Sequence, residues 1–283
     1  MNIVSIKNLN ITFKQHGNLI HAVRNISLDL SEGESLGIVG ESGSGKSVTF
    51  MSLLGLINSP NAIINAEKLE VGGIDLLTNQ KKQLSKIRGK IASMVFQDSM
   101  TSFDPLFTIG YQIVETILTH KNINKKDAFN EALQLLEKVE IQNPEQVINY
   151  YPHQLSGGML QRAMIAMALS CEPKLLIADE PTTALDVTVQ AQILQLIKDL
   201  QLEKNMSLIM ITHDLGVIAE TVDRVIVMYG GQIMENSNVY EIFDKPSHPY
   251  TKALIDSIPG QEPGKRKLKE ITQTERDLSL IHI

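Results

Sequence analysis

The sequence of 283 residues has only one cysteine and no excess of basic residues. The lone Cys171 excludes an internal disulfide, and we expect it to fill space on a packed helix. There are 26 basic residues against 32 acidic ones, which gives a net charge of -6. A net negative charge has the same sign as a phosphate backbone and would repel it. We therefore expect no nucleic acid among its partners.

Long hydrophobic runs are also missing. No stretch approaches the roughly 20 apolar residues that cross a bilayer as a helix. The N-terminal residues contain no basic run followed by an apolar one, so we expect no secretory signal. With 43% hydrophobic residues the chain can still build one large core or two modest ones. We expect a cytoplasmic globular protein, for which another chain supplies any membrane path.

The pattern of apolar residues predicts an α/β fold. Residues 3–13 and 22–30 mix apolar and polar positions around a polar turn and predict antiparallel strands. An apolar run at 35–39 leads through a glycine-rich loop into a helical stretch at 46–57. Helical stretches alternate with several later strands, and this alternation predicts a mostly parallel sheet. The later strand candidates are residues 91–96, 175–178, 207–212 and 225–228.

The middle of the chain is predicted to be helical, because Phe129, Leu133, Leu136 and Val139 recur at the spacing of one amphipathic helix. A glycine pair at 230–231 predicts a hairpin before residues 233–235. From residue 261 onward charge rises and periodicity disappears, and we expect a tail.

Residues 40–47 fit the pattern G-x-x-x-x-G-K-[ST], placed where a strand should turn into a helix. Glycines let backbone N–H groups converge on phosphates, Lys46 reaches the β and γ phosphates, and Ser47 binds Mg²⁺. An ordinary glycine turn is the alternative. By itself the loop predicts only that a nucleoside triphosphate such as ATP is bound. The predicted ATP-binding residues are Gly40, Ser42, Gly43, Ser44, Gly45, Lys46 and Ser47.

Two carboxylates, Asp179 and Glu180, directly follow the apolar strand predicted at residues 175–178. A buried strand of this kind delivers acids to the carboxyl edge of a parallel sheet. We expect Asp179 to hold Mg²⁺, largely through water, and Glu180 to act as the general base toward the attacking water. A strand end followed by a helix cap is the alternative for this pair.

Residues 155–162, Leu-Ser-Gly-Gly-Met-Leu-Gln-Arg, place Ser-Gly-Gly at the start of a predicted helix. A helix N-terminus with a hydroxyl and two glycines suits an anion. The segment resembles the signature motif of ABC ATPases, which faces the γ phosphate bound by the other subunit. The resemblance implies contacts to the partner's ATP from Ser156, Gly157, Gly158 and Gln161.

Other residues appear in that family's order. Gln97 resembles the Q-loop glutamine, which implies roles in catalysis and at Mg²⁺, and His213 resembles the switch histidine at the γ phosphate. Residues 184–186 are similar to the D-loop at the dimer seam. Phe13 is placed like the aromatic residue that stacks on adenine, with packing inside the chain as the alternative. A binding subunit without turnover is disfavoured, because the catalytic residues are all present.

The resemblance covers residues 1 to about 245. It implies an α/β fold with a P-loop NTPase core of ABC type, an N-terminal antiparallel β subdomain and an inserted helical subdomain at about residues 98–172. Residues 246–277 form a further C-terminal segment, which we expect to be truncated.

Residues 247–254, Ser-His-Pro-Tyr-Thr-Lys-Ala-Leu, are called the His-Pro-Tyr segment below. This segment resembles the tail of peptide and nickel importer ATPases, and residues 98–105 and 150–161 look like that subfamily too. Residues 159–160 and 163–168 are similar to its D-type subunit. The resemblance implies uptake of di- and oligopeptides, with a nickel or metal-chelate importer left open. A soluble ABC ATPase of DNA repair or translation is disfavoured, because coiled-coil insertions and a second fused ATPase unit are missing.

The same resemblance implies several partners. They are a homologous second ATPase subunit, or a homodimer in isolation, two membrane permeases and an extracytoplasmic solute-binding protein. It also implies a peripheral position on the cytoplasmic face of the membrane.

The C-terminal residues carry two expectations. Many D-type members have four further cysteines that bind an iron–sulfur cluster, and such a cluster is not supported here. Residues 278–283 equal the in-frame translation of CTG TCT CTT ATA CAC ATC, a transposon-end adapter of sequencing libraries. We expect a chain truncated near Asp277 and fused to adapter sequence. The missing cysteines are therefore weak evidence against an iron–sulfur cluster.

Overall fold

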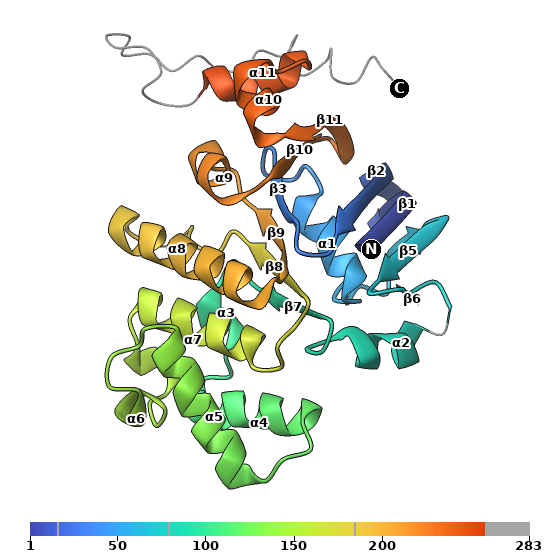
Figure 1. Cartoon of the computed structure of the whole chain (residues 1–283). Helices are drawn as coiled ribbons and strands as arrows, with labels where there is room; N and C mark the ends of the chain where they lie inside the picture. The colour runs from blue at the N-terminus through green and yellow to red at the C-terminus, as the bar shows by residue number, and fades with distance from the viewer. Residues whose placement is uncertain (16, 79, 184, 258–283) are drawn as a thin grey trace, which may run out of the picture.

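The computed structural model describes residues 1–15, 17–78, 80–183 and 185–257 (Figure 1). The expected adapter residues at 278–283 lie outside this range. The described residues form two sheets, with a group of helices at the end remote from the N-terminal sheet. No helix among them is long and apolar enough to span a bilayer.

The N-terminal sheet is antiparallel. Its order is β2-β1-β5-β6, and β4 also pairs with β1. The predicted antiparallel pair is confirmed by a register that places Val4 opposite Leu30. The sequence patterns missed three of the strands, which have only two to four residues each. The strands are β1 (Asn2–Gln15), β2 (Asn18–Ser31), β4 (Ala62–Asn65), β5 (Lys68–Val71) and β6 (Ile74–Asp75).

The second sheet has the order β11-β10-β3-β9-β8-β7. All neighbours are parallel except β11, which forms the predicted hairpin with β10. The prediction of a mostly parallel sheet is therefore confirmed. The strands are β3 (Ser35–Val39), β7 (Ala92–Val95), β8 (Leu175–Asp179), β9 (Ser207–Ile211), β10 (Arg224–Tyr229) and β11 (Gln232–Asn238).

The core covers both faces of the parallel sheet, and every residue of its central strands β3, β8 and β9 is buried. Alternate side chains point to opposite faces. Ile38 and Ile209 pack with α1 and the N-terminal sheet, whereas Val39 and Met210 pack toward the helical subdomain. Continuous apolar strands are what burial on both faces requires.

The helices account for most of the remaining described residues, and those of the inserted block lie together at one end of the molecule (Figure 1). Helix α1 ends earlier than predicted, because Leu54 and Gly55 form a turn. The helices are α1 (Lys46–Leu53), α2 (Gln80–Ile87), α3 (Ser99–Ser102), α4 (Ile109–His120), α5 (Lys125–Lys138), α6 (Pro144–Val147), α7 (Gly157–Leu169), α8 (Val187–Lys204), α9 (Leu215–Thr221), α10 (Val239–Asp244) and α11 (Pro249–Asp256), with a 3₁₀ turn at Pro152–Gln154.

The amphipathic helix predicted around residues 129–139 is α5, and three of its four apolar positions, Leu133, Leu136 and Val139, are buried or partly buried. Ala128, Ala132 and Leu136 are fully buried, whereas Phe129 is 40% exposed. The small alanine side chains face α4 and α7, the helices on which α5 packs. Side-chain size at the helix contact, rather than hydrophobicity alone, sets which face is buried.

Helix α7 ties the helical subdomain to the rest of the molecule. Arg162 is 8% exposed, and its Nη1 donates to the Val139 carbonyl at 2.8 Å and to Glu140 Oε2 at 3.0 Å. Its Nη2 donates to Gln192 on α8 at 3.2 Å. Cys171 lies beyond the end of α7 and is half-buried, so the expectation that it packs on a helix was wrong.

Candidate active site

The predicted catalytic residues meet at the carboxyl edge of the parallel sheet. The phosphate loop follows β3, Gln97 lies just beyond β7, and His213 lies just beyond β9. Asp179 ends β8 and Glu180 follows it. Because β3, β9, β8 and β7 are consecutive neighbours in the sheet, their carboxyl ends bring these side chains together.

Lys46 is enclosed by its own loop. Its Nζ donates to the carbonyl oxygens of Gly40 at 2.7 Å and Glu41 at 2.9 Å, and lies 3.4 Å from Ser44 Oγ. Burial lowers the pKa of Lys46, and the nearby acids, Glu180 foremost, oppose that shift. The loop therefore holds a cation that lacks full hydration, which favours the approach of phosphate oxygens.

Two glycines let the loop lie against neighbouring strands. Gly40 has φ +148°, and a Cβ there would collide with the Met228 carbonyl on β10. Gly45 caps α1 with φ +92°, and a Cβ there would collide with the Ala22 carbonyl on β2. Any larger residue would push the loop off these strands. The loop is thus fixed to both sheets.

Ser47 and Asp179 form an oxygen pair beside the loop. The Ser47 hydroxyl donates to Asp179 Oδ1 at 2.8 Å, and Asp179 is 3% exposed. Burial raises the pKa of Asp179, while the hydrogen bond from Ser47 opposes the shift. Hydroxyl and carboxylate oxygens are ligands that Mg²⁺ prefers, usually together with phosphates and water. The donor set fits Mg²⁺ held between protein and nucleotide.

Glu180 is held by three polar side chains. Gln97 Nε2 donates to Glu180 Oε2 at 2.9 Å, and the Thr183 hydroxyl donates to the same oxygen at 2.8 Å. His213 Nδ1 lies 3.1 Å from Glu180 Oε1. The Glu180 backbone has φ +45°, a conformation that L-residues rarely adopt and that often marks functional sites. These contacts fix the direction of the carboxylate.

A cavity of about 750 Å³ joins these groups. Its size is typical of pockets that bind small molecules. The sequence patterns missed Ala22 and Thr183, because neither belongs to a motif. Phe13 is not among the lining residues, and lies on β1 opposite Ile20, partly buried against the N-terminal core. Its stacking on adenine stays a prediction. The lining consists of Ala22, Ser42, Gly43, Ser44, Gly45, Lys46, Ser47, Val48, Gln97, Glu180, Thr183 and His213.

The signature residues lie apart from this cavity. Ser156 caps α7 by accepting a hydrogen bond from the Met159 N–H at 3.3 Å, and both Ser156 and Gly157 are exposed. Gln161 differs, because it is only 3% exposed, and it lines a second cavity of about 310 Å³ together with Gln97 and Gly157. The contact of Gln161 with a partner's ATP stays a prediction.

Comparisons with known proteins agree with this geometry. Residues 23–183 match a family model described as ABC transporter, and residues 234–282 match one described as oligopeptide/dipeptide transporter, C-terminal region. The chain belongs to the ABC transporter ATP-binding family. It is an ATPase by membership, and its nucleotide is ATP.

Two curated relatives of this ABC ATPase are named for transport or import. The dipeptide transport ATP-binding protein of Haemophilus influenzae is 50% identical over 271 residues, covering 96% of this chain and 82% of the relative. The glutathione import ATP-binding protein of Escherichia coli is 51% identical over 265 residues, covering 91% of this chain. The match spans only 42% of that second relative.

Solved structures of ABC proteins share the fold. A dimeric ATP-binding cassette in a post-hydrolysis state, bound to ADP and phosphate, matches with a TM-score of 0.73 at 30% identity, covering 83% of this chain and 98% of that one. A component of an ABC transporter complex from Clostridium perfringens matches with a TM-score of 0.70 at 25% identity, covering 86% of this chain and 91% of that one. The predicted α/β fold of ABC type is confirmed.

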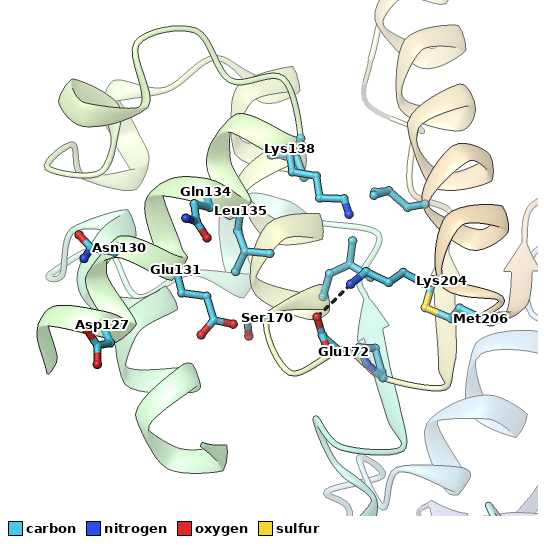
Figure 2. A pocket seen from close by; sticks show the side chains of 14 residues that line it. Asp127, Asn130, Glu131, Gln134, Leu135, Lys138, Ser170, Glu172, Lys204 and Met206 are labelled. Carbon is cyan, nitrogen blue, oxygen red and sulfur yellow. Dashed lines mark hydrogen bonds and ion pairs between the residues drawn. The ribbon is translucent and has the colours of Figure 1, made fainter. Parts of the chain in front are cut away.

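Another cavity of the ABC ATPase, of about 450 Å³, lies between α5, the turn after α7 and the end of α8 (Figure 2). It contains two lysines. Figure 2 shows Lys204 directed at Glu172, 2.9 Å away, and Lys138 pairs with Glu203 at 2.6 Å. Both lysines are thus paired with acids, and no glycine is among the described residues that line this cavity.

The substitution Glu180→Gln tests the assignment of the base. The amide keeps the size of the side chain but cannot accept the proton, so we expect ATP hydrolysis to fall by at least about 100-fold. ATP binding should persist, because Lys46 and Ser47 are untouched. Release of phosphate measures the first effect, and nucleotide affinity measures the second. A variant that hydrolyses ATP at the parental rate would contradict the assignment.

Proposed function

We propose that this ATPase powers the uptake of di- and oligopeptides through an importer in the membrane. The observation that carries the proposal is one chain that combines the phosphate-loop site with the His-Pro-Tyr segment, in the region that matches the peptide-transporter model. The relatives are named for dipeptide transport and for glutathione import, and glutathione is itself a tripeptide. Nothing in these names favours the nickel alternative.

In the proposed reaction, ATP lies along the phosphate loop with Lys46 on its β and γ phosphates. Glu180 accepts a proton from the water that attacks the γ phosphate, and Gln97 and His213 keep the carboxylate in position. Mg²⁺ between Ser47 and Asp179 would neutralise phosphate charge when bound. The products are ADP and inorganic phosphate.

The site is proposed to be completed by a second ATPase subunit. Ser156 and the N-terminus of α7 are exposed and contribute nothing to the lining of their own subunit's cavity. A hydroxyl and a helix N-terminus form a second anion site, suited to a γ phosphate brought by the partner. The partner is a homologous chain in the importer, with a homodimer possible for the isolated protein.

Complementation between two defective copies tests the shared site. One copy carries Ser156→Arg and the other Lys46→Ala. If the signature acts on the partner's ATP, one site of the mixed pair is intact and the other has both defects. We expect about one trapped nucleotide per mixed pair and none in pairs of either variant alone. Failure of the mixed pair to trap nucleotide would mean that Ser156 serves its own subunit.

The permeases are proposed to dock on the helical subdomain. Leu106 is 78% exposed, Met100 54% and Tyr111 47%, and Phe107 stacks on Tyr111 with ring centroids 4.7 Å apart. A gathering of large exposed apolar side chains marks a protein contact. The patch follows Gln97 in the chain, so movement at the ATP site can reach it. This docking would hold the chain on the cytoplasmic face of the membrane.

The substitution Leu106→Glu tests this docking face. A charge in an apolar contact is costly to bury, so we expect loss of ATPase capture by membranes that contain the permeases. ATP binding by the free subunit should not change. Leu202→Glu is the matched control, because Leu202 is 65% exposed on α8 outside the patch. Equal capture of both variants would contradict the proposed face.

Uptake by cells tests the transported solute. A strain that carries Glu180→Gln in this chain should lose uptake of labelled di- and oligopeptides and keep uptake of labelled Ni²⁺. The physical reason is that only transport driven by this ATPase loses its energy source. Loss of Ni²⁺ uptake with peptide uptake intact would overturn the peptide proposal in favour of the metal importer.

A further inference from the structure

The His-Pro-Tyr segment contacts the phosphate loop. Tyr250, on α11, is fully buried, and its hydroxyl accepts a hydrogen bond from the Glu41 backbone N–H at 3.2 Å. These two residues are separated by 209 positions in the sequence. Glu41 is the second residue of the phosphate loop. The segment that resembles peptide importers is therefore in direct contact with the ATP site.

The contact falls on a peptide unit that also binds Lys46. The N–H of Glu41 and the C=O of Gly40 belong to one planar peptide group, and in a trans peptide they point in opposite directions. Tyr250 accepts from the N–H, while Lys46 Nζ donates to the C=O at 2.7 Å. Turning this peptide would break both bonds. Tyr250 and Lys46 thus bind the two opposite polar groups of one peptide unit.

The position of Tyr250 is itself fixed. Its ring lies against Tyr229 at the end of β10, with centroids 4.7 Å apart. The start of α11 is held by Glu235, whose two carboxylate oxygens accept from the N–H groups of Ser247 at 2.8 Å and His248 at 3.0 Å. His248 Nδ1 then caps the helix by accepting from the Tyr250 N–H at 3.1 Å. Every residue of the His-Pro-Tyr motif starts or anchors this helix.

We infer that Tyr250 is a positioning residue for ATP binding, which orients the Gly40–Glu41 peptide and through it Lys46. The inference rests on the proposed role of the phosphate loop in holding ATP. A loop that is already ordered loses less conformational entropy when the nucleotide binds. The His-Pro-Tyr segment therefore raises the affinity for ATP without touching it.

The substitution Tyr250→Phe removes the hydroxyl and keeps the ring that packs on Tyr229. One lost hydrogen bond of this kind corresponds to about a 3- to 10-fold rise in KM for ATP. We expect kcat to be unchanged, because the loop holds ATP equally before and during the reaction. Hydrogen exchange at the Glu41 amide should become faster in the nucleotide-free protein. The measurement uses the full chain paired with its ATPase partner.

Tyr240→Phe is the matched control, because Tyr240 belongs to the same region and is 78% exposed. It makes the same chemical change and should alter neither KM nor exchange. Glu235→Gln provides a second variant, since a weaker anchor for α11 should raise KM in the same direction. A KM for Tyr250→Phe equal to the parental value overturns the inference. So does a lower kcat with unchanged KM, which is the result expected of a residue that only stabilises the fold.

Lys46→Ala separates this inference from the proposed function. If Lys46→Ala loses affinity for ATP while Tyr250→Phe keeps it, the phosphate-loop assignment stands and the inference about Tyr250 fails. If Lys46→Ala binds ATP with unchanged affinity, the phosphate-loop assignment itself fails. Loss of affinity in both variants, greater in Lys46→Ala, supports both.

Discussion

The enclosed charge of Lys46 is the interaction on which the rest of the structure depends. Removing an ammonium from water is costly, and here the cost is offset by the carbonyls of Gly40 and Glu41 and by the acids at the carboxyl end of β8. Those carbonyls are available only because the loop is bent tightly between two sheets. The bend in turn requires glycine where the loop meets the carbonyls of Ala22 and Met228. The burial of the Lys46 charge, the shape of the phosphate loop and the packing of the two sheets thus depend on one another.

The acids beside Lys46 have different surroundings, which suit the different roles proposed for the two carboxylates. Asp179 is buried and bonded to the Ser47 hydroxyl, a setting suited to a cation. Glu180 is turned by its φ of +45° toward the cavity and toward Gln97 and His213. A carboxylate directed into the cavity by polar neighbours is suited to handle a proton. The backbone conformation at Glu180 therefore places the two carboxylates in different surroundings.

The features of this site that could be predicted from the sequence are local in the chain. The phosphate loop and the acids after β8 follow from apolar runs that end in polar motifs, and the parallel sheet then brings those ends together. Thr183 could not be predicted, since its bond to Glu180 depends on the path of a turn. Phe129 shares the helical spacing of Leu136 yet is 40% exposed, whereas the small Ala128 and Ala132 are buried, and periodicity alone does not show this difference. Gln161 sits in a motif yet is almost fully buried, which only the packing of α7 decides.

The contact between Tyr250 and Glu41 could not be predicted from the sequence either, because no local pattern connects residues so far apart in the chain. A tyrosine preceded by proline reads as an ordinary helix start. Only the fold places its hydroxyl on a loop amide, and only the shared peptide plane makes that amide matter to Lys46. A segment added after the ATPase domain can therefore tune ATP affinity without altering any residue that contacts ATP. Members of this family with different C-terminal segments could share the same catalytic residues and still differ in how firmly the phosphate loop is held.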